Sequence, residues 1–387
     1  MRPQQQKPAA NDGGQRNVGA TFAGRVVRDA FRPRAKPRSR DEHLDAAIAW
    51  LKRAQAATPD GGVSYGYSIR GGWRPSYREA SGYIAVTFFD LARQLHDAEA
   101  DALARTVADW LWEVQEPDGS IANPRYHHNE GIVFDTGQVL LGYVRAYRET
   151  GEARFRDAAT LSASWLASTL DEDGAWRRNT HLQTPHTYNV RAAWAMLESN
   201  DIAPDPIIEA AARRNLDWGL EQQTPAGFFR SCAFEPGFAP FTHTIAYAIR
   251  GFLESGRLLE DSLYADTAIR AADAVLQHVR RDGWIPGQID ETGQARASYC
   301  CLTGNCQLSI IWLKLHQLTG SQQYLDAAKQ SLEYVMGCQD LATPNLALRA
   351  AIKGSQPIWG RYAPLSYPSW ATKFFIDAIL LLIDIES

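Results

Sequence analysis

The apolar positions of the chain recur with helical spacing from residue 41 onward. Six segments carry apolar residues at i, i+3, i+4 and i+7 with charged residues between them, which is the pattern of a helix buried on one side. These segments are 41–55, 98–115, 153–170, 206–222, 263–280 and 322–336. A loop with glycine and aromatic residues follows each segment, and a second segment rich in Ala, Gly, Leu and Ile follows each loop. The pattern therefore predicts six helical pairs.

The second helix of each pair is apolar nearly all round and belongs inside the fold. Steps of 54, 51, 56, 61 and 64 residues separate the predicted starts of these helices, which lie near Ser81, Asp135, His186, Thr242, Thr303 and Tyr367. One helical pair cannot bury its inner face alone, so repeated pairs must pack on one another. Strand signals are scarce. We predict an all-α fold, an (α/α)6 toroid forming a single domain over residues 41–387, with an open helical solenoid as the alternative.

The net charge of −4 combines two oppositely charged parts. Residues 1–40 carry ten Lys or Arg and two Asp, a balance of +8, whereas the other residues have a balance of −12. The Gln, Pro, Arg and Ser content of this basic leader is typical of disorder. It lacks the apolar region of a secretory signal and the arginine pair of a twin-arginine signal. A basic arm can contact nucleic acid or anionic lipid, but we interpret this one as an inert extension and predict no nucleic-acid partner.

The composition argues against a membrane-spanning protein and against a disulfide-rich one. No run of 18 apolar residues occurs, so no membrane span is expected. Five cysteines are an odd number in a chain without an export signal, which favours reduced thiols and a cytoplasmic location. Cys300, Cys301 and Cys306 cluster, but their spacing is not that of a structural zinc site. We predict neither a metal nor a cofactor.

Polar and aromatic side chains gather just before and at the start of each predicted inner helix. In a toroid these six starts converge on one rim, so residues far apart in sequence would face one cavity. Helix N-termini favour anionic groups, aromatic faces stack on sugars, and sugar hydroxyls need polar partners. We therefore predict a glycan as the ligand. The predicted binding residues are Trp73, Arg74, Tyr77, Gln138, Asn189, Arg191, Asn305, Lys353, Trp359, Arg361, Tyr362 and Tyr367.

Two carboxylates occupy equivalent places in adjacent repeats. Glu79 and Asp135 are 56 residues apart, at the starts of two predicted inner helices. Across a funnel they are able to act as acid and base in glycosidic cleavage, or in hydration of an unsaturated uronide. The alternative role for Asp135 at a helix start is that of an ordinary N-cap.

The densest polar cluster consists of His186, Tyr188, Asn189 and Arg191, and His243 follows one repeat further on. With helical spacing, residues 188 and 191 share one face and residues 186 and 189 share another. His186 and His243 together also suit an epimerase that moves a proton from one face of a sugar to the other. A buried hydrogen-bonding network that pins the helix is the alternative role for this cluster.

The repeated helix–loop–helix unit with Asp-Gly loops resembles the six-hairpin toroids of glycosidases, uronyl hydrolases, polysaccharide lyases, glucuronyl C5-epimerases and N-acylglucosamine 2-epimerases. The His, Tyr, Asn and Arg set resembles that of toroidal uronate lyases, in which neutralisation of the carboxylate makes the α-proton acidic and Tyr or His removes it. Residues 71–77, 134–141, 186–194, 242–250 and 359–362 are together similar to a bacterial toroid family associated with exopolysaccharide gene clusters. This resemblance covers about residues 41–383.

A weaker resemblance is to the toroids of terpenoid cyclases and prenyltransferases, whose repeat carries Gln-x-x-x-Gly followed by an aromatic residue. Residues 115–119, and residues 223–227 with Phe229, match this repeat loosely. The acidic run of the cyclases is missing, because residues 171–174 are Asp-Glu-Asp-Gly. The zinc triad of the prenyltransferases has no counterpart either. The resemblance therefore supports a shared architecture and not isoprenoid chemistry.

The leading hypothesis is an enzyme of lyase or epimerase type that acts on an acidic, uronate-containing polysaccharide or oligosaccharide in exopolysaccharide metabolism. Its chemistry would be acid/base catalysis in the toroid funnel. The predicted catalytic residues are His186, Tyr188, His243, Glu79 and Asp135. The alternatives are a glycoside hydrolase that uses Glu79 and Asp135, a non-catalytic glycan-binding toroid, and a terpenoid-cyclase-like enzyme. The sequence names neither the sugar nor the oligomeric state.

Overall fold

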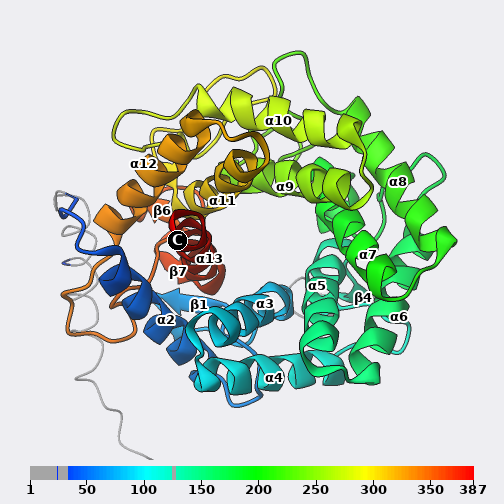
Figure 1. Cartoon of the computed structure of the whole chain (residues 1–387), viewed down its shortest axis with the longest axis horizontal. Helices are drawn as coiled ribbons and strands as arrows, with labels where there is room; N and C mark the ends of the chain where they lie inside the picture. The colour runs from blue at the N-terminus through cyan, green and yellow to red at the C-terminus, as the bar shows by residue number, and fades with distance from the viewer. Residues whose placement is uncertain (1–23, 25–33, 124–127) are drawn as a thin grey trace, which may run out of the picture.

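The structure of the protein, a computed structural model, describes residue 24, residues 34–123 and residues 128–387. Its helices form two concentric rings around a central opening (Figure 1). The outer ring consists of α2 (Arg40–Ala56), α4 (Ala98–Glu113), α6 (Ala153–Thr169), α8 (Pro206–Glu221), α10 (Ser262–Leu276) and α12 (Gln322–Cys338). The inner ring consists of α3 (Arg78–Leu95), α5 (Val133–Thr150), α7 (Val190–Ile202), α9 (Thr242–Leu258), α11 (Leu302–Thr319) and α13 (Ser369–Glu386).

The inner ring closes between its last and its first helix. Helix α13 packs against α11 on one side, and against α3 and α2 on the other. The fold is therefore the predicted (α/α)6 toroid, and the open solenoid is excluded. Helix α9 begins at Thr242 as predicted, whereas α7 begins at Val190, four residues after the predicted start, because a 3-10 turn (Thr187–Asn189) precedes it.

Among the helices that the structure describes, side-chain caps occur at four of the outer helices, whereas the outer helices α6 and α12 begin without one. Ser39 and Glu42 form a reciprocal capping box at α2, and Asp97, Asp205 and Asp261 accept backbone hydrogen bonds at the starts of α4, α8 and α10. In the described residues, α3, α5, α9, α11 and α13 begin without a side-chain cap. The positive ends of their dipoles therefore point, unmasked, toward the loops at that end of the toroid.

Neighbouring inner helices approach each other most closely at glycine. A Cβ atom added at Gly82 in α3 would lie 2.5 Å from the carbonyl oxygen of Gln138 in α5. One added at Gly137 in α5 would lie 2.7 Å from the Cβ atom of Ala192 in α7. Because a helix-interior glycine is otherwise unfavourable, this packing explains the small residues that distinguish the inner helices in the sequence.

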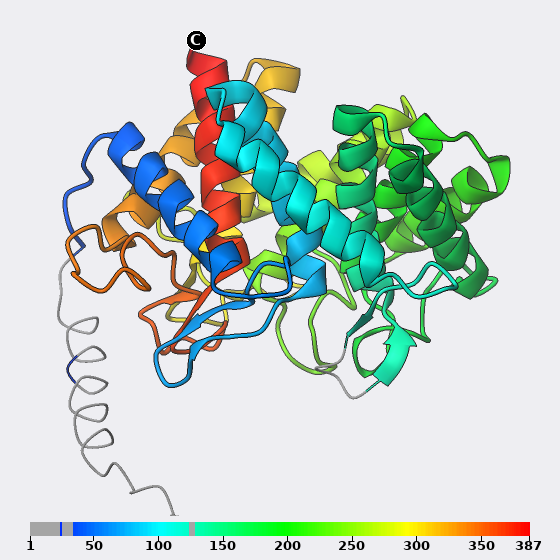
Figure 2. The same ribbon diagram turned by 90° about the horizontal axis from the view of Figure 1, so that it is seen from below.

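Short strands and long loops gather at one end of the toroid, the end at which the inner helices begin (Figure 2). The strands are β1 (Gly66–Ser68), β2 (Gly72–Trp73), β3 (Ala122–Asn123), β4 (His128–Gly131), β5 (Cys300–Cys301), β6 (Ser355–Gln356) and β7 (Ser366–Pro368). β1 pairs with both β2 and β7, so that Tyr67 lies opposite Trp73 and Tyr367. The β1–β7 pairing joins the first repeat to the last and fastens the ring at its loop end.

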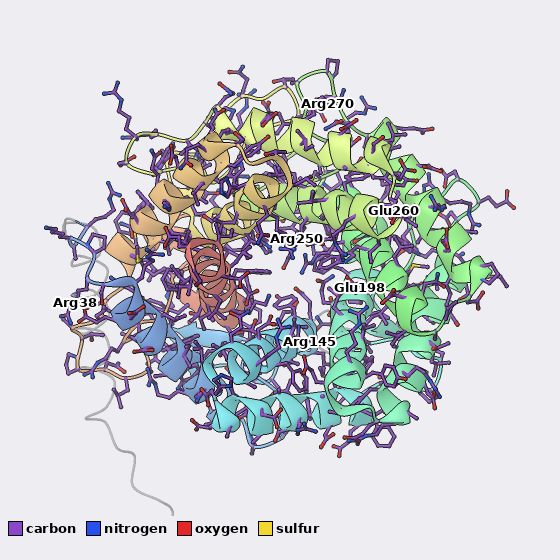
Figure 3. The ribbon with its side chains drawn as sticks, viewed as in Figure 1. Arg38, Arg145, Glu198, Arg250, Glu260 and Arg270 are labelled. Atoms are coloured by element: carbon purple, nitrogen blue, oxygen red, sulfur yellow. The ribbon has the colours of Figure 1, made fainter. Side chains whose placement is uncertain are left out.

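Ion pairs connect neighbouring inner helices at the end of the toroid opposite the loop end. Figure 3 shows Glu198 and Arg250 beside the opening. Glu198 in α7 pairs with Arg148 in α5 at 2.7 Å. Glu254 in α9 pairs with Arg250 in the same helix at 2.6 Å and with Lys314 in α11 at 2.9 Å. Basic side chains near the C-terminal ends of these helices also offset the negative ends of the helix dipoles.

The predicted disordered leader, residues 1–40, lies almost entirely outside the described residues, and its disorder stays a prediction. Near its end, Arg34 pairs with Asp282 at 2.7 Å and the Ala35 N–H donates to the Gly337 carbonyl. The last residues of this segment therefore contact the outer ring. Of the helices in the described ranges, none combines the length and the apolar character that crossing a membrane requires.

Candidate active site

A cavity of about 590 Å³ lies at the loop end of the toroid, among the starts of α3, α5, α7, α9 and α13. We refer to it as the carboxyl cavity. Its volume falls within the range of about 300–1,000 Å³ that is usual for small-molecule sites. Aromatic side chains form much of its wall: Tyr65, Tyr77, Phe134, Tyr188, Phe234, Phe241, Tyr247, Tyr362 and Trp370.

Two carboxylic acids line this cavity from the first turns of adjacent inner helices. Glu79 on α3 accepts hydrogen bonds from the hydroxyls of Tyr77 and Tyr83, the latter at 3.2 Å. Asp135 on α5 accepts a hydrogen bond from Asn123 Nδ2 at 2.7 Å. The fold thus brings together two acids that are 56 residues apart in sequence.

Asp135 is not a helix cap. Helix α5 begins at Val133, its N-cap residue is Ile132, and that cap receives no side-chain hydrogen bond. The interpretation of Asp135 as an ordinary N-cap is therefore wrong. The residue is buried, 3% exposed, and its carboxylate accepts a hydrogen bond from Asn123 in the preceding loop.

Burial raises the pKa of both acids. The pKa of Glu79 is raised to about 7 by burial, against the hydrogen bonds from Tyr77 and Tyr83 and the charge of Arg191, which lower it. The pKa of Asp135 is raised well above its ordinary value by burial and by the negative charge of Glu79. Because two adjacent carboxylates resist ionising together, the pair retains a proton near neutral pH. The tyrosine hydroxyls stabilise an ionised Glu79, which leaves that proton on Asp135.

Arg191 lies behind the wall of the carboxyl cavity and does not line it. Its guanidinium stacks on the rings of Trp194 and Tyr247, at 4.9 Å from each centroid, and its Nε donates to Gln138 Oε1 at 2.6 Å. Burial lowers the pKa of Arg191 to about 10, so it remains a cation at neutral pH. Arg191, which was predicted to bind substrate, thus favours the ionised form of Glu79 from outside the cavity. Gln138, also predicted to bind substrate, instead accepts a hydrogen bond from Arg191.

His243 lines the cavity from the first turn of α9. Its Nδ1 donates to Gln307 Oε1 at 2.8 Å, so Nε2 is the unprotonated nitrogen of the neutral ring. Burial lowers the pKa of His243 to about 3, which makes the ring a weak base. The imidazole packs at 4.3 Å from the Tyr247 ring. Its chemistry suits acceptance of a hydrogen bond better than removal of a proton from carbon.

His186 lies outside the carboxyl cavity and lines a neighbouring one. Its two ring nitrogens face backbone carbonyls, with Nδ1 at 3.0 Å from the Ala233 oxygen and Nε2 at 2.8 Å from the His181 oxygen. The ring stacks on Tyr188, which does line the carboxyl cavity, at a centroid distance of 4.7 Å. This placement favours the alternative role of His186, in a hydrogen-bonding network that holds two loops together.

Arg361 supplies a positive charge at the edge of the cavity. Within the described lining it is the one side chain with a permanent positive charge. Its guanidinium stacks on the Phe238 ring at 4.9 Å. The next residue, Tyr362, is buried, and its hydroxyl accepts a hydrogen bond from Trp370 Nε1 at 2.7 Å. Arg361 is thereby held between two loops with its cation free to meet an anion.

Some of the predicted site residues line the carboxyl cavity, and the others lie elsewhere. It is lined by these predicted residues: Glu79, Asp135, Tyr188, His243, Tyr77, Asn189, Arg361 and Tyr362. Besides His186, Gln138 and Arg191, the predicted residues that do not line it are Trp73, Arg74, Asn305, Lys353, Trp359 and Tyr367. Their local contacts explain two of these positions, since Asn305 Nδ2 donates to the Gly283 carbonyl at 3.0 Å and Trp73 packs on Trp50.

The sequence reasoning missed residues one helical turn inside the inner helices and residues on the loops. Tyr83 and Tyr247 follow Glu79 and His243 by four residues, so the i, i+4 spacing from each predicted residue was a signal that identifies them. His181 lines the cavity from the loop before α7. Nothing in its local pattern distinguishes it from other loop histidines.

The cysteines and acidic side chains of the described residues show no arrangement that resembles a metal site. Cys232, Cys300, Cys301 and Cys306 are buried thiols, and the Cys338 thiol is partly buried. Within the described residues no group of three or more His, Cys, Asp or Glu side chains is arranged to hold a metal ion.

Comparison of the sequence with models of protein families and with curated proteins finds no match. Solved structures, in contrast, are similar over almost the whole chain. An unsaturated glucuronyl hydrolase specific for heparin has a TM-score of 0.70 at 16% identity, over 90% of this chain and 97% of that one. An unsaturated glucuronyl hydrolase from Bacillus sp., responsible for the degradation of glycosaminoglycan, has a TM-score of 0.68 at 14% identity, over 88% and 96%.

A cellobiose 2-epimerase from Bacillus thermoamylovorans is also similar, with a TM-score of 0.66 at 12% identity, over 95% of this chain and 100% of that one. Identities this low establish the fold alone. The predicted resemblance to the toroids of carbohydrate-active enzymes is therefore confirmed at the level of the fold.

Proposed function

We propose that the protein is a carbohydrate-active enzyme that removes a terminal unsaturated uronyl residue from an acidic oligosaccharide, with Glu79 and Asp135 as its acid/base pair. The observation that carries the proposal is a pair of buried carboxyls with raised pKa values in an aromatic-lined cavity. Perturbed carboxyls in a cleft are what acid/base catalysis at neutral pH requires. The position of His186 outside this cavity favours the hydrolytic alternative over the lyase or epimerase type.

Asp135 is assigned as the general acid and Glu79 as the general base. Asp135 holds the proton of the pair because burial and the charge of Glu79 both raise its pKa. Glu79 ionises first, since two tyrosine hydroxyls and the buried Arg191 stabilise its charge. A pair whose surroundings push the two pKa values apart provides both functions at a single pH.

A 4,5-unsaturated uronyl residue suits this pair because its double bond is an enol ether. Asp135 would protonate C4, and the ring oxygen would stabilise the cation that develops at C5. Glu79 would take a proton from the water that adds to C5. The hemiketal formed in this way opens and releases the remaining glycan, so one water is consumed for each bond cleaved and no other reactant is needed. The glucuronyl hydrolases of similar fold support this choice of substrate class.

The cavity offers partners for both the ring and the carboxylate of a uronate. Its aromatic wall provides stacking faces for the sugar ring. Arg361 would pair with the carboxylate, because a guanidinium donates two parallel hydrogen bonds to such a group. Asn189 Oδ1 is buried, and no donor within the described part of the chain bonds to it. A sugar hydroxyl would satisfy this oxygen.

The proposal is tested by incubating the protein with an unsaturated chondroitin disaccharide and following the ultraviolet absorbance of its conjugated double bond. We expect the absorbance to fall with time, and the rate to decrease about 100- to 10,000-fold in Asp135→Asn, because that variant lacks the proton donor. Asp118→Asn is the matched control, since Asp118 caps a turn through the Ser120 N–H and does not line the cavity. Constant absorbance across a panel of unsaturated uronides would contradict the proposal.

A 2-epimerase is the second candidate. His181 lines the carboxyl cavity and its pKa is lowered by burial, so its uncharged imidazole is a candidate base for a proton exchange between two faces of a sugar. A cellobiose 2-epimerase is among the similar folds. This activity would appear as deuterium uptake from heavy water into cellobiose without bond cleavage, and it would be lost in His181→Ala. A cytoplasmic location and a role in exopolysaccharide metabolism stay predictions from the sequence.

A further inference from the structure

A second cavity, of about 810 Å³, adjoins the carboxyl cavity. The two cavities share two lining residues, Glu235 and Arg361. Between them also lies the stacked pair of His186, which lines the second cavity, and Tyr188, which lines the first. The second cavity is therefore adjacent to the proposed reaction site, with these side chains at the boundary between them.

The wall of the second cavity is built to receive a polar ligand with flat faces. Phe238 is 48% exposed, which is unusual for a large aromatic side chain, and it carries the Arg361 guanidinium on its face at 4.9 Å. The loop that bears Phe238 runs along one side of the cavity, and residues 288–296 contribute to another. An exposed aromatic ring beside a polar loop is the usual arrangement for stacking a sugar.

The charges of the second cavity differ from those expected for an anion site. Arg296 is paired with Asp290 at 2.6 Å, so its charge is already offset. Glu235 and Glu291 also line the cavity and form no ion pair within the described residues. Arg361 and Glu235 are both shared with the carboxyl cavity, whereas Glu291 lines the second cavity alone. A second acidic or sulfated sugar would therefore meet the unpaired carboxylate of Glu291, whereas an uncharged sugar would meet only hydrogen-bond acceptors and an aromatic face.

We infer that the second cavity holds the sugar residues that follow the terminal uronyl residue, and that it selects uncharged sugars there. This inference rests on the proposed function, and it makes the substrate an oligosaccharide in which a terminal uronate precedes a neutral or N-acetylated residue. Arg361 then lies at the junction of the two cavities. Its guanidinium binds the uronate carboxylate, while its flat face stacks on Phe238. Chain length beyond the terminal residue contributes affinity through the second cavity.

The experiment measures binding by calorimetry in an Asp135→Asn background, in which the substrate is not consumed. The probes are methyl β-glucuronide and an unsulfated, unsaturated chondroitin disaccharide, in which the terminal uronate precedes an uncharged N-acetylgalactosamine. We expect the disaccharide to bind about tenfold more tightly than the monosaccharide, and Phe238→Ala to remove most of that difference. Leu263→Ala, which removes a 57% exposed side chain from α10, is the control for loss of a surface apolar group.

Charge selection is tested with the same disaccharide sulfated on its hexosamine. We expect it to bind several-fold more weakly than the unsulfated one, and Glu291→Gln to reduce that difference, because the substitution removes one unpaired carboxylate. Equal affinity for the two unsulfated probes, or an undiminished difference in Phe238→Ala, overturns the inference alone. If neither probe binds to the folded protein, the inference and the proposed function fail together.

Discussion

Removal of the Tyr83 hydroxyl isolates one interaction that sets the pKa of Glu79. Tyr83 is 1% exposed, donates to Glu79 Oε1 at 3.2 Å, and does not line the carboxyl cavity. Tyr83→Phe therefore changes the environment of the proposed base without removing a substrate contact. Because the lost hydrogen bond favours the ionised carboxylate, the pKa of Glu79 must rise in this variant.

The size of the effect follows from the strength of that hydrogen bond. A hydrogen bond to a charged group contributes about 1.5–3 kcal/mol, and the 3.2 Å length places this one near the lower end. About 1.4 kcal/mol corresponds to about one pH unit. Starting from a pKa of about 7, the ionised fraction of Glu79 at pH 7 would fall from about a half to about a tenth. The rate at pH 7 should then fall about fivefold, and the loss should be smaller at higher pH.

The assay is the pH dependence of kcat/KM on an unsaturated uronyl oligosaccharide. The limb on which activity rises with pH reports ionisation of the base, and we expect Tyr83→Phe to move it upward by about one pH unit. Tyr143→Phe is the matched control, since that buried tyrosine donates to the Leu111 carbonyl and has no contact with the acid pair. A limb that stays in place, or moves to lower pH, would refute the assignment of Glu79 as the base.

Three further predictions concern stability. The pKa values of Glu79 and Asp135 are raised in the folded protein, so the stability that their protonated forms provide is complete below their unfolded pKa values and is lost as pH rises through about 7. The wild-type Tm should therefore fall more between pH 5 and pH 8 than the Tm of the double variant Glu79→Gln/Asp135→Asn. Parallel curves of Tm against pH would disprove the linkage. His186→Ala should lower the free energy of unfolding in urea by about 1–3 kcal/mol. The neutral ring carries a single N–H, so its loss leaves one of the two carbonyls that it faces, those of His181 and Ala233, without a donor. A large loss of kcat at unchanged stability would instead restore His186 as a catalytic base. Gly82→Ala should lower the free energy of unfolding by about 1–3 kcal/mol, because the new Cβ would lie 2.5 Å from the Gln138 carbonyl oxygen. Gly71→Ala should be nearly neutral, because its Cβ would meet only the end of the Arg74 side chain, at 3.9 Å. Equal effects of the two substitutions would contradict the packing argument.

Helical periodicity was sufficient to predict the toroid because burial of each helix is a local property of its sequence. The outer helices alternate charged and apolar faces, and the inner ones are apolar nearly all round, so the two rings can be separated without knowing any contact. The starts of the inner helices followed to within a few residues. This accuracy was enough to predict that Glu79, Asp135 and His243 face one cavity, and all three line the carboxyl cavity.

An error of a few residues in a helix start was too large where a shift of one or two residues changes the direction of a side chain. Helix α7 starts after a 3-10 turn, so the helical spacing assumed from residue 186 onward does not apply. Tyr188 consequently lines the cavity, while Arg191, which was expected on the same face, lies behind the wall. His181 was missed for a different reason. The path of its loop is set by contacts with distant loops, such as the hydrogen bond that it receives from His186.

Backbone contact between α3, α5 and α7 also limits how a protein of this kind acquires new substrates. Glycine is already the smallest residue, so no substitution at Gly82 or Gly137 can bring the helices closer together and narrow the central opening. Any larger residue forces two helices apart. The width of the funnel is thereby held constant by the scaffold. Variation in ligand shape must instead be accommodated by the rim, where loops such as residues 231–240 can be lengthened or exchanged while the helices beneath them keep their spacing.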